Sequence, residues 1–281
     1  MEHLPADGGD RLKVVKGDLS SIDKLCEAMA GHDVVFHYAS NPDIARAATE
    51  PDVDFWHGTY LTQNVVEAMR RTGVGQLIYA SGSGVYGDTG LTALSEDHAP
   101  LLPISTYGAS KLAGEALICS YCSMFGLQAW VFRFANVVGP RQTHGVAFDF
   151  LRRLNADRRR LSILGDGTQS KSYIHVDDIL NGIWLAWGKA ASAYNYFNLA
   201  TDDHITVAEI AAMVVDIMGL ADVELQYSGG NRGWKGDVPL IRMDTGKIKA
   251  LGWRARRSTR EAVESSIRAM YASPAPAAVC G

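Results

Sequence analysis

The chain contains the stretch Ser105-Thr-Tyr107-Gly-Ala-Ser-Lys111, which joins a helix start to a Tyr/Lys pair. This stretch predicts the start of a helix that runs to about Gly126, because Ser105 or Thr106 can cap the first free amides and Gly126 permits a left-handed end. Tyr107 and Lys111 are four residues apart, so their side chains lie on one face. A nearby ammonium lowers the pKa of a phenol and makes it a proton carrier. The pair is therefore a candidate acid/base, against the alternative of surface residues that share a face by chance.

Composition places the chain among ordinary soluble proteins. Its 281 residues are 47% hydrophobic and 21% charged, which suits one large domain or two small ones with a sizeable core. A net charge of −4 argues against nucleic-acid binding. The absence of a long apolar run or a signal peptide argues against a membrane protein. Four cysteines do not indicate a disulfide framework or a metal site, so a cytoplasmic location is expected.

Strands and helices alternate through the first two thirds of the chain. Each strand is a nearly continuous apolar run, which predicts a parallel sheet covered on both faces. The predicted strands span residues 12–16, 33–37, 76–80, 127–134 and 194–199, with helices at 20–30, 55–71 and 105–126. Ligands of such sheets bind at the carboxyl ends of the strands. The segments at those ends are Gly17-Asp18, Tyr38-Ala39 and Ser81-Gly-Ser83.

The part of the chain after residue 139 has a different pattern. Helices are predicted at residues 146–154, 177–188 and 206–218, the last one opened by the capping box Thr206-Val-Ala-Glu209. A short strand at 172–176 and a glycine-rich polar segment at 228–236 separate them, and residues 247–253 and 259–270 close the fold. Residues 273–281 are small and proline-containing, which predicts a disordered tail.

The chain resembles the extended short-chain dehydrogenase/reductases of the NAD-dependent epimerase/dehydratase family, and within them the UDP-glucose 4-epimerase-like proteins. The motifs that carry the resemblance are Gly17-Asp18-Leu19, His37-Tyr-Ala39, Tyr107-x-x-x-Lys111, Arg133-Phe-Ala-Asn136-Val-Val-Gly-Pro140, Gly165-Asp-Gly-Thr-Gln-Ser-Lys171-Ser-Tyr-Ile-His-Val-Asp-Asp178 and Arg232-Gly-Trp-Lys-Gly-Asp237. The resemblance implies an α/β fold, a Rossmann-like doubly wound parallel sheet with a smaller C-terminal substrate-binding subdomain. Residues 1–139 with 172–200 would bind NAD, and residues 140–171 with 201–272 would bind the substrate.

The resemblance also implies roles for single residues. Tyr107 would be the catalytic acid/base, and Lys111 would hold the ribose hydroxyls of NAD and tune Tyr107. Further contacts to NAD would come from Asp18 and Leu19 at the adenine, from Tyr38, Ala39 and Ser81, and from Phe134 near the nicotinamide. The sugar diphosphate would be held by Asn136, Lys171 and Arg232. On the residues alone, Asn136 can equally be a turn residue and Lys171 a solvated lysine.

The chain departs from the family pattern in three places. The glycine-rich turn that cradles the cofactor pyrophosphate and the following acidic strand end have no counterpart, so the first βαβ unit is expected to be lacking. Three explanations for this difference remain open: the chain is a fragment, its start is mis-assigned, or it is a truncated variant. Gly82 stands where the family usually has a catalytic Ser or Thr, with Ser83 as the candidate substitute. Gly58 stands where an Asn often contacts the cofactor.

The implied function is NAD-dependent epimerisation of a nucleotide sugar, as in a UDP-hexose 4-epimerase, with the hydride leaving and returning through a 4-keto intermediate. Ser83 and Gly84 occupy the positions of an acidic pair found in the 4,6-dehydratases, which argues against dehydration. Two alternatives remain: a reductase or decarboxylase of the same family, and a non-catalytic remnant that binds or regulates a partner. The resemblance further suggests a homodimer built on the helices at 55–71 and 105–126.

Overall fold

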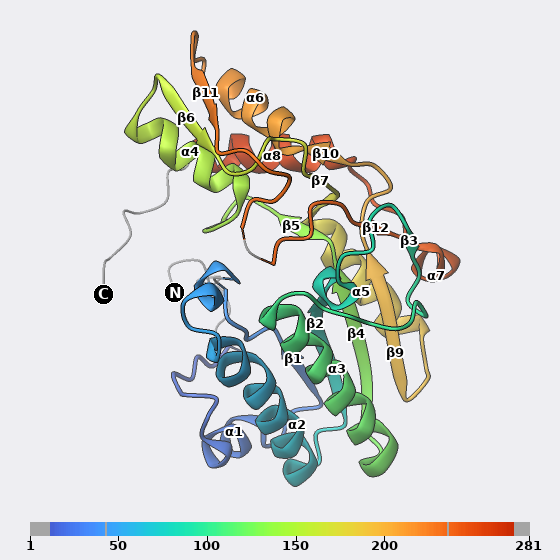
Figure 1. Ribbon diagram of the computed structural model, residues 1–281. Helices are drawn as coiled ribbons and strands as arrows, with labels where there is room; N and C mark the ends of the chain where they lie inside the picture. Colours follow the sequence, from blue (N-terminus) through green and yellow to red (C-terminus); the bar gives the residue numbers. More distant parts are fainter. Residues whose placement is uncertain (1–11, 43, 235, 273–281) are drawn as a thin grey trace.

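The computed structural model describes residues 12–42, 44–234 and 236–272. The chain forms two adjoining regions (Figure 1). One is a parallel sheet with helices on both faces, and the other is a smaller helical region with short strands. The predicted tail at 273–281 lies outside the described residues.

The central sheet has four parallel strands in the order β1-β2-β4-β9. These strands are β1 (Val34–His37), β2 (Gln76–Gly82), β4 (Gln128–Phe134) and β9 (Tyr194–Leu199). In their register Val35 lies opposite Leu77, and Ile78 lies opposite Trp130. Parallel strands need crossover connections, and helices provide them here. The predicted Rossmann-like α/β fold is therefore confirmed, and β9 returns to the sheet as expected.

Helices cover both faces of this sheet. They are α1 (Ile22–Met29), α2 (Tyr60–Thr72), α3 (Thr106–Phe125), α5 (Val176–Lys189) and α7 (Gly246–Ala250). Because successive strand residues point to opposite faces, Leu77 packs with α1, α2 and α3, while Ile78 packs with α5 and α7. Both faces of the sheet therefore pack against helices, although Phe36 of β1 is still 37% exposed.

The predicted helix at 55–71 is confirmed, but its first turn is a π-helix, η3 (Phe55–Thr59). A β-carbon added at Gly58 would overlap the Ser110 hydroxyl of α3. Thr59 Oγ1 donates to Ser110 Oγ at 3.1 Å, and Ser110 Oγ donates to the Asp54 carbonyl at 2.8 Å. The wide turn therefore presses its backbone against α3. Two short 3-10 helices, η2 (Ile44–Ala48) and η4 (Ser83–Tyr86), follow β1 and β2.

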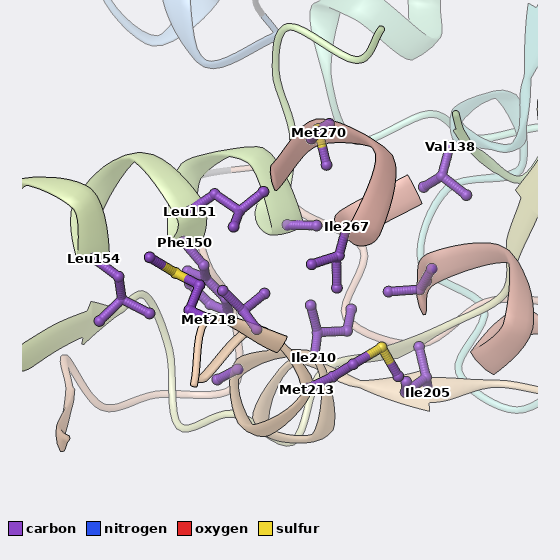
Figure 2. Packing of buried hydrophobic residues seen from close by; sticks show 14 of the residues in the cluster. Val138, Phe150, Leu151, Leu154, Ile205, Ile210, Met213, Met218, Ile267 and Met270 are labelled. Carbon is purple, nitrogen blue, oxygen red and sulfur yellow. The ribbon is translucent and has the colours of Figure 1, made fainter. Parts of the chain in front are cut away.

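The smaller region has its own hydrophobic core. Its helices are α4 (Val146–Ala156), α6 (Val207–Ile217) and α8 (Thr259–Ala272). Figure 2 shows side chains from all three helices converging, among them Phe150, Leu154, Ile210, Met213, Ile267 and Met270. The predicted capping box opens α6, because Thr206 and Glu209 exchange hydrogen bonds.

Short strand pairs complete this region and join it to the sheet. The pairs are β6 (Arg160–Ile163) with β11 (Glu224–Tyr227), β5 (Asn136–Val138) with β8 (Tyr173–His175), β7 (Ser170–Lys171) with β10 (Ile205–Thr206), and β3 (Ala93–Leu94) with β12 (Arg242–Met243). β5 and β8 bring the segments that follow β4 and precede α5 side by side. No helix in the described part of the chain has the length and apolar character needed to cross a membrane.

One predicted strand is wrong. Residues 12–16 have no regular structure, and Leu12, Val14 and Val15 are 44%, 49% and 58% exposed. A strand persists only if its main-chain groups find a neighbouring strand. β1 lies at one end of the sheet and pairs only with β2 among the described strands, so none of these strands pairs with residues 12–16.

Candidate active site

Helix α3 brings the phenol of Tyr107 beside the amine of Lys111. The helix begins as predicted, with Ser105 Oγ accepting the Gly108 amide at 3.1 Å, and ends at Gly126 with φ +73°. Lys111 Nζ lies 5.5 Å from the centroid of the Tyr107 ring and donates to the Ala80 carbonyl at 2.8 Å. The backbone of β2 therefore holds the amine against the tyrosine.

These two side chains line a cavity of about 260 Å³ at the carboxyl ends of the strands. Its lining comes from β2, β4, α3 and the loops that follow β1 and β5. The lining residues are Tyr38, Ser40, Asn41, Pro42, Ala80, Ser81, Tyr107, Lys111, Phe134 and His144. The structure thus brings together five predicted site residues from separate segments of the sequence. They are Tyr38, Ser81, Tyr107, Lys111 and Phe134.

Burial controls the protonation of the pair. Tyr107 keeps part of its surface open to the cavity. The surrounding protein raises the pKa of Tyr107 to about 12, opposed by a hydrogen bond with Ser40 and reinforced by the charge of Asp54. Burial also lowers the pKa of Lys111 to about 8, while Asp54 acts in the opposite direction. The predicted lowering of the Tyr107 pKa is therefore wrong, because burial, which favours the neutral phenol, dominates.

The serines around Gly82 do not contribute equally. Ser81 lines the cavity, but its hydroxyl donates to Glu115 Oε1 at 2.5 Å. Ser83 begins η4, is half-buried, and is outside the cavity lining. Gly82 has extended backbone, and a β-carbon added there would meet no atom within 4 Å. A side chain could therefore be accommodated at Gly82.

A buried ion pair supports the site from below. Glu115 lies one turn beyond Lys111 on α3, and its Oε2 accepts Arg133 Nη2 of β4 at 2.7 Å. Both side chains are about 5% exposed or less. Arg133 Nη1 also donates to the Tyr86 hydroxyl at 3.0 Å and to the Glu96 carbonyl at 2.9 Å. Glu115 follows Lys111 by four residues, as Lys111 follows Tyr107. This spacing indicates from the sequence alone that Glu115 shares their helix face.

Three residues assigned to NAD lie outside the cavity lining: Asp18 and Leu19, assigned to the adenine, and Ala39. Asp18 precedes α1 and accepts the Ser20 amide at 2.9 Å. The carbonyl of Leu19 accepts Asn64 Nδ2 at 3.1 Å, which ties this segment to α2. Ala39 is half-buried in the loop after β1. The structure does not bring these three residues into contact with the Tyr107–Lys111 pair.

The residues assigned to the sugar diphosphate are engaged within the protein. Asn136 Nδ2 donates to the Ser172 carbonyl at 3.2 Å, and Lys171 pairs with Asp237 at 2.5 Å. Arg232 pairs with Asp88 at 2.5 Å. A β-carbon added at Gly236 would lie 3.4 Å from the Ile104 carbonyl, so the loop that carries Asp237 lies against the residues that lead into α3.

Sequence comparison identifies relatives along most of the chain. The family model described as the NAD dependent epimerase/dehydratase family matches residues 2–200. The uncharacterized UDP-glucose epimerase YtcB of Bacillus subtilis is 30% identical over 210 residues, which are 74% of this chain and 66% of that protein. A UDP-glucose 4-epimerase of Mycolicibacterium smegmatis is 29% identical over 270 residues, which are 93% of this chain and 84% of that protein.

Solved structures give the same result for the fold. A UDP-galactose 4-epimerase superposes with a TM-score of 0.82 and 34% identity, over 91% of this chain and 82% of that one. The dTDP-glucose 4,6-dehydratase DesIV of Streptomyces venezuelae, with NAD and DAU bound, superposes with a TM-score of 0.87 and 25% identity, over 96% and 82%. Epimerases and dehydratases thus both resemble this chain, which belongs to the NAD dependent epimerase/dehydratase family.

Proposed function

We propose that this protein is an NAD-dependent epimerase of a nucleotide sugar, which inverts the configuration at C4 of a UDP-hexose. The observation that carries the proposal is the placement of Tyr107 and Lys111 side by side in a cavity at the carboxyl ends of β1, β2 and β4. The dinucleotide of doubly wound folds binds at this edge. The solved dehydratase that superposes on the chain contains NAD.

The cavity suits the nicotinamide half of NAD. Its volume of about 260 Å³ is smaller than usual for a whole drug-sized ligand and fits one part of a dinucleotide. Phe134 and Tyr38 offer aromatic surfaces to the ring, and Lys111 offers a donor to ribose hydroxyls. When bound, NAD supplies the acceptor that takes a hydride from the sugar carbon and returns it, and its oxidised ring adds positive charge beside the phenol.

The chain supplies positioning and proton transfer. Tyr107 takes the proton from the sugar hydroxyl. It gives the proton back after the keto sugar has rotated in the site and presents its other face. Lys111 keeps a cation beside the phenolate. Residues 140–171 with 201–272 form the proposed substrate subdomain, where Lys171 and Arg232 exchange their carboxylate partners for the diphosphate. Asn136 adds a neutral donor to the same group.

The lining of the cavity favours epimerisation over dehydration. Removal of water from a sugar needs an acid that protonates the departing hydroxyl. Among the described residues, no Asp or Glu lines the cavity, and Ser83 and Gly84 occupy the positions of the acidic pair. Epimerisation needs only the phenol, because one proton leaves and returns at one oxygen.

The test is turnover of UDP-glucose to UDP-galactose in the presence of NAD, measured for the wild type and for Tyr107→Phe. We expect Tyr107→Phe to abolish turnover and to leave the thermal midpoint of unfolding nearly unchanged. Tyr121→Phe, on the same helix and outside the cavity lining, serves as the matched control. Wild-type turnover by Tyr107→Phe would refute the assignment.

Product analysis separates the remaining alternatives. UDP-glucuronate and the N-acetylated sugars are offered in parallel, since a decarboxylase releases carbon dioxide and a reductase consumes reduced cofactor. Absence of NAD from the purified protein, together with no binding of added NAD, would instead favour a non-catalytic binding protein. Gly82 is the feature of the site that favours this alternative.

We also propose a homodimer through α2 and α3. Trp56 of η3 and Met124 of α3, which are 51% and 71% exposed, would offer apolar surface to the second subunit. Light scattering at several concentrations tests this association.

We also propose a cytoplasmic location, supported by the free thiols of Cys26, Cys119 and Cys122.

A further inference from the structure

The candidate active site lacks an obvious hydroxyl partner for the phenol of Tyr107. A buried phenolate is costly unless hydrogen-bond donors face its oxygen. Gly82, at the end of β2, has no side chain to offer. The hydroxyl of Ser81 is bound to Glu115 at 2.5 Å, and Ser83 is outside the cavity lining. The neighbouring segment of β2 therefore supplies no free hydroxyl to the cavity.

A hydroxyl reaches the cavity from a different element. Ser40 lies three residues beyond the end of β1 and lines the cavity together with Tyr107 and Lys111. Hydrogen bonding by the Ser40 side chain acts to lower the pKa of the Tyr107 phenol, against the effect of burial. The two residues are 67 positions apart in the sequence, so a tertiary contact has to hold them together.

The carboxylate of Asp54 makes that tertiary contact. Its Oδ1 accepts Asn41 Nδ2 at 2.8 Å, and its Oδ2 accepts Thr106 Oγ1 at 2.7 Å. Asn41 directly follows Ser40, and Thr106 directly precedes Tyr107. Asp54 is 1% exposed, so water does not compete for these hydrogen bonds. One carboxylate thus clamps the loop that carries Ser40 to the first turn of α3.

We propose that Ser40 is a catalytic residue that donates a hydrogen bond to the reacting oxygen of Tyr107, in place of a side chain at Gly82. The inference rests on the proposed function and adds a residue to it. In the reaction, the sugar hydroxyl loses its proton to the Tyr107 phenolate, and the Ser40 proton stays on Ser40. The hydrogen bond stabilises the phenolate before the transfer and weakens when Tyr107 becomes neutral.

Other charged and titratable groups face the same oxygen or its partners. Lys111 lies on α3, Asp54 precedes η3, His37 ends β1, Tyr38 follows it, Tyr79 lies on β2, and His144 comes from the loop after β5. None of these six is changed in the variants used below. Their influence therefore cancels when the variants are compared with the wild type.

The first measurement is an NMR titration of the protein labelled at the tyrosine hydroxyl-bearing carbon, without substrate. The signal that disappears in Tyr107→Phe identifies Tyr107. We expect Ser40→Ala to raise the pKa of Tyr107 by about one pH unit, since a hydrogen bond to a charged group contributes about that much. At a fixed pH below the transition, the ionised fraction then falls about tenfold. Ser120→Ala, an exposed serine on α3, serves as the control.

The second measurement moves the hydroxyl to the other element. Gly82→Ser has room for its side chain and needs no unusual backbone angle. We expect the double variant Ser40→Ala with Gly82→Ser to recover most of the lost ionisation and turnover. We expect Ser40→Ala alone to slow UDP-hexose turnover about tenfold, with a pH–rate profile displaced to higher pH.

The outcomes separate this inference from the proposed function. An unchanged Tyr107 titration in Ser40→Ala, or a larger change in Ser83→Ala than in Ser40→Ala, overturns the role of Ser40 even if the protein is an epimerase. A shifted titration without any turnover of nucleotide sugars supports the Ser40–Tyr107 hydrogen bond and refutes the proposed function. If Ser40→Ala unfolds, Ser40→Cys and Ser40→Thr replace it, and only the threonine is expected to preserve the titration.

Discussion

Replacing Glu115 by alanine should destabilise the fold by about 3–5 kcal/mol, because the change leaves a buried guanidinium without its counter-charge. Arg133 Nε and Nη2 make three hydrogen bonds to the two Glu115 oxygens, at 2.7–3.2 Å. After the substitution the Tyr86 hydroxyl and the Glu96 carbonyl are the hydrogen-bond acceptors that the structure describes for Arg133. The Ser81 hydroxyl loses its acceptor as well. Such a loss is a large fraction of the about 5–15 kcal/mol that stabilises a typical domain.

The assay for Glu115→Ala is urea unfolding followed by tryptophan fluorescence, because Trp130 of β4 is buried in the folded protein. Two controls define the cause. Glu67→Ala removes a carboxylate of the surface pairs on α2 and should cost far less. Replacing both partners, with Glu115→Leu and Arg133→Met together, should restore most of the stability, because no unpaired charge remains. A cost for Glu115→Ala no larger than that for Glu67→Ala would refute this reasoning.

Two further predictions concern pH and backbone geometry. Burial lowers the pKa of His37 to about 4 from its ordinary 6.5. The unfolded chain therefore binds the proton first as the pH falls, and about 3 kcal/mol of stability is lost from pH 6.5 to 4. Unfolding curves at the two pH values should show a smaller loss in His37→Asn. Gly87→Ala should cost at least about 2 kcal/mol in urea unfolding, since φ is +78° and the new β-carbon would overlap the Leu102 carbonyl. Gly90→Ala, with φ +61° and open space, should cost less, and equal losses would contradict the prediction.

The fold was predictable where local signals decide it. Ser105 and Gly126 mark the ends of α3 in the sequence, and the structure places the helix between them. The strands β2, β4 and β9 were predictable from their apolar runs, because all three are paired in the sheet. The same kind of run failed at residues 12–16. Strand formation depends on a neighbour elsewhere in the chain, and no local pattern reports whether that neighbour is present.

The site was predictable only in part for a similar reason. The spacing of Tyr107 and Lys111 on one helix face is a local property, and the structure has it. The clamp through Asp54 joins segments 13 and 52 residues away, so no short motif contains it. The direction of the Tyr107 pKa was also mispredicted. Spacing reveals which charge is near, whereas burial, which dominates here, depends on the whole fold.

Close packing around α3 explains why the geometry of the candidate site can be tight without the usual residue at Gly82. A β-carbon at Gly108 would crowd the Gly84 carbonyl of η4, and one at Gly114 would overlap the Tyr79 hydroxyl of β2. The helix therefore lies against the backbone of η4 on one side of Lys111 and against the Tyr79 side chain of β2 on the other. A displacement of about 1 Å at a reacting group can cost about a hundredfold in rate. These contacts restrict movement of α3 toward η4 and β2, and the Asp54 hydrogen bonds hold the loop that carries Ser40 to the first turn of the helix.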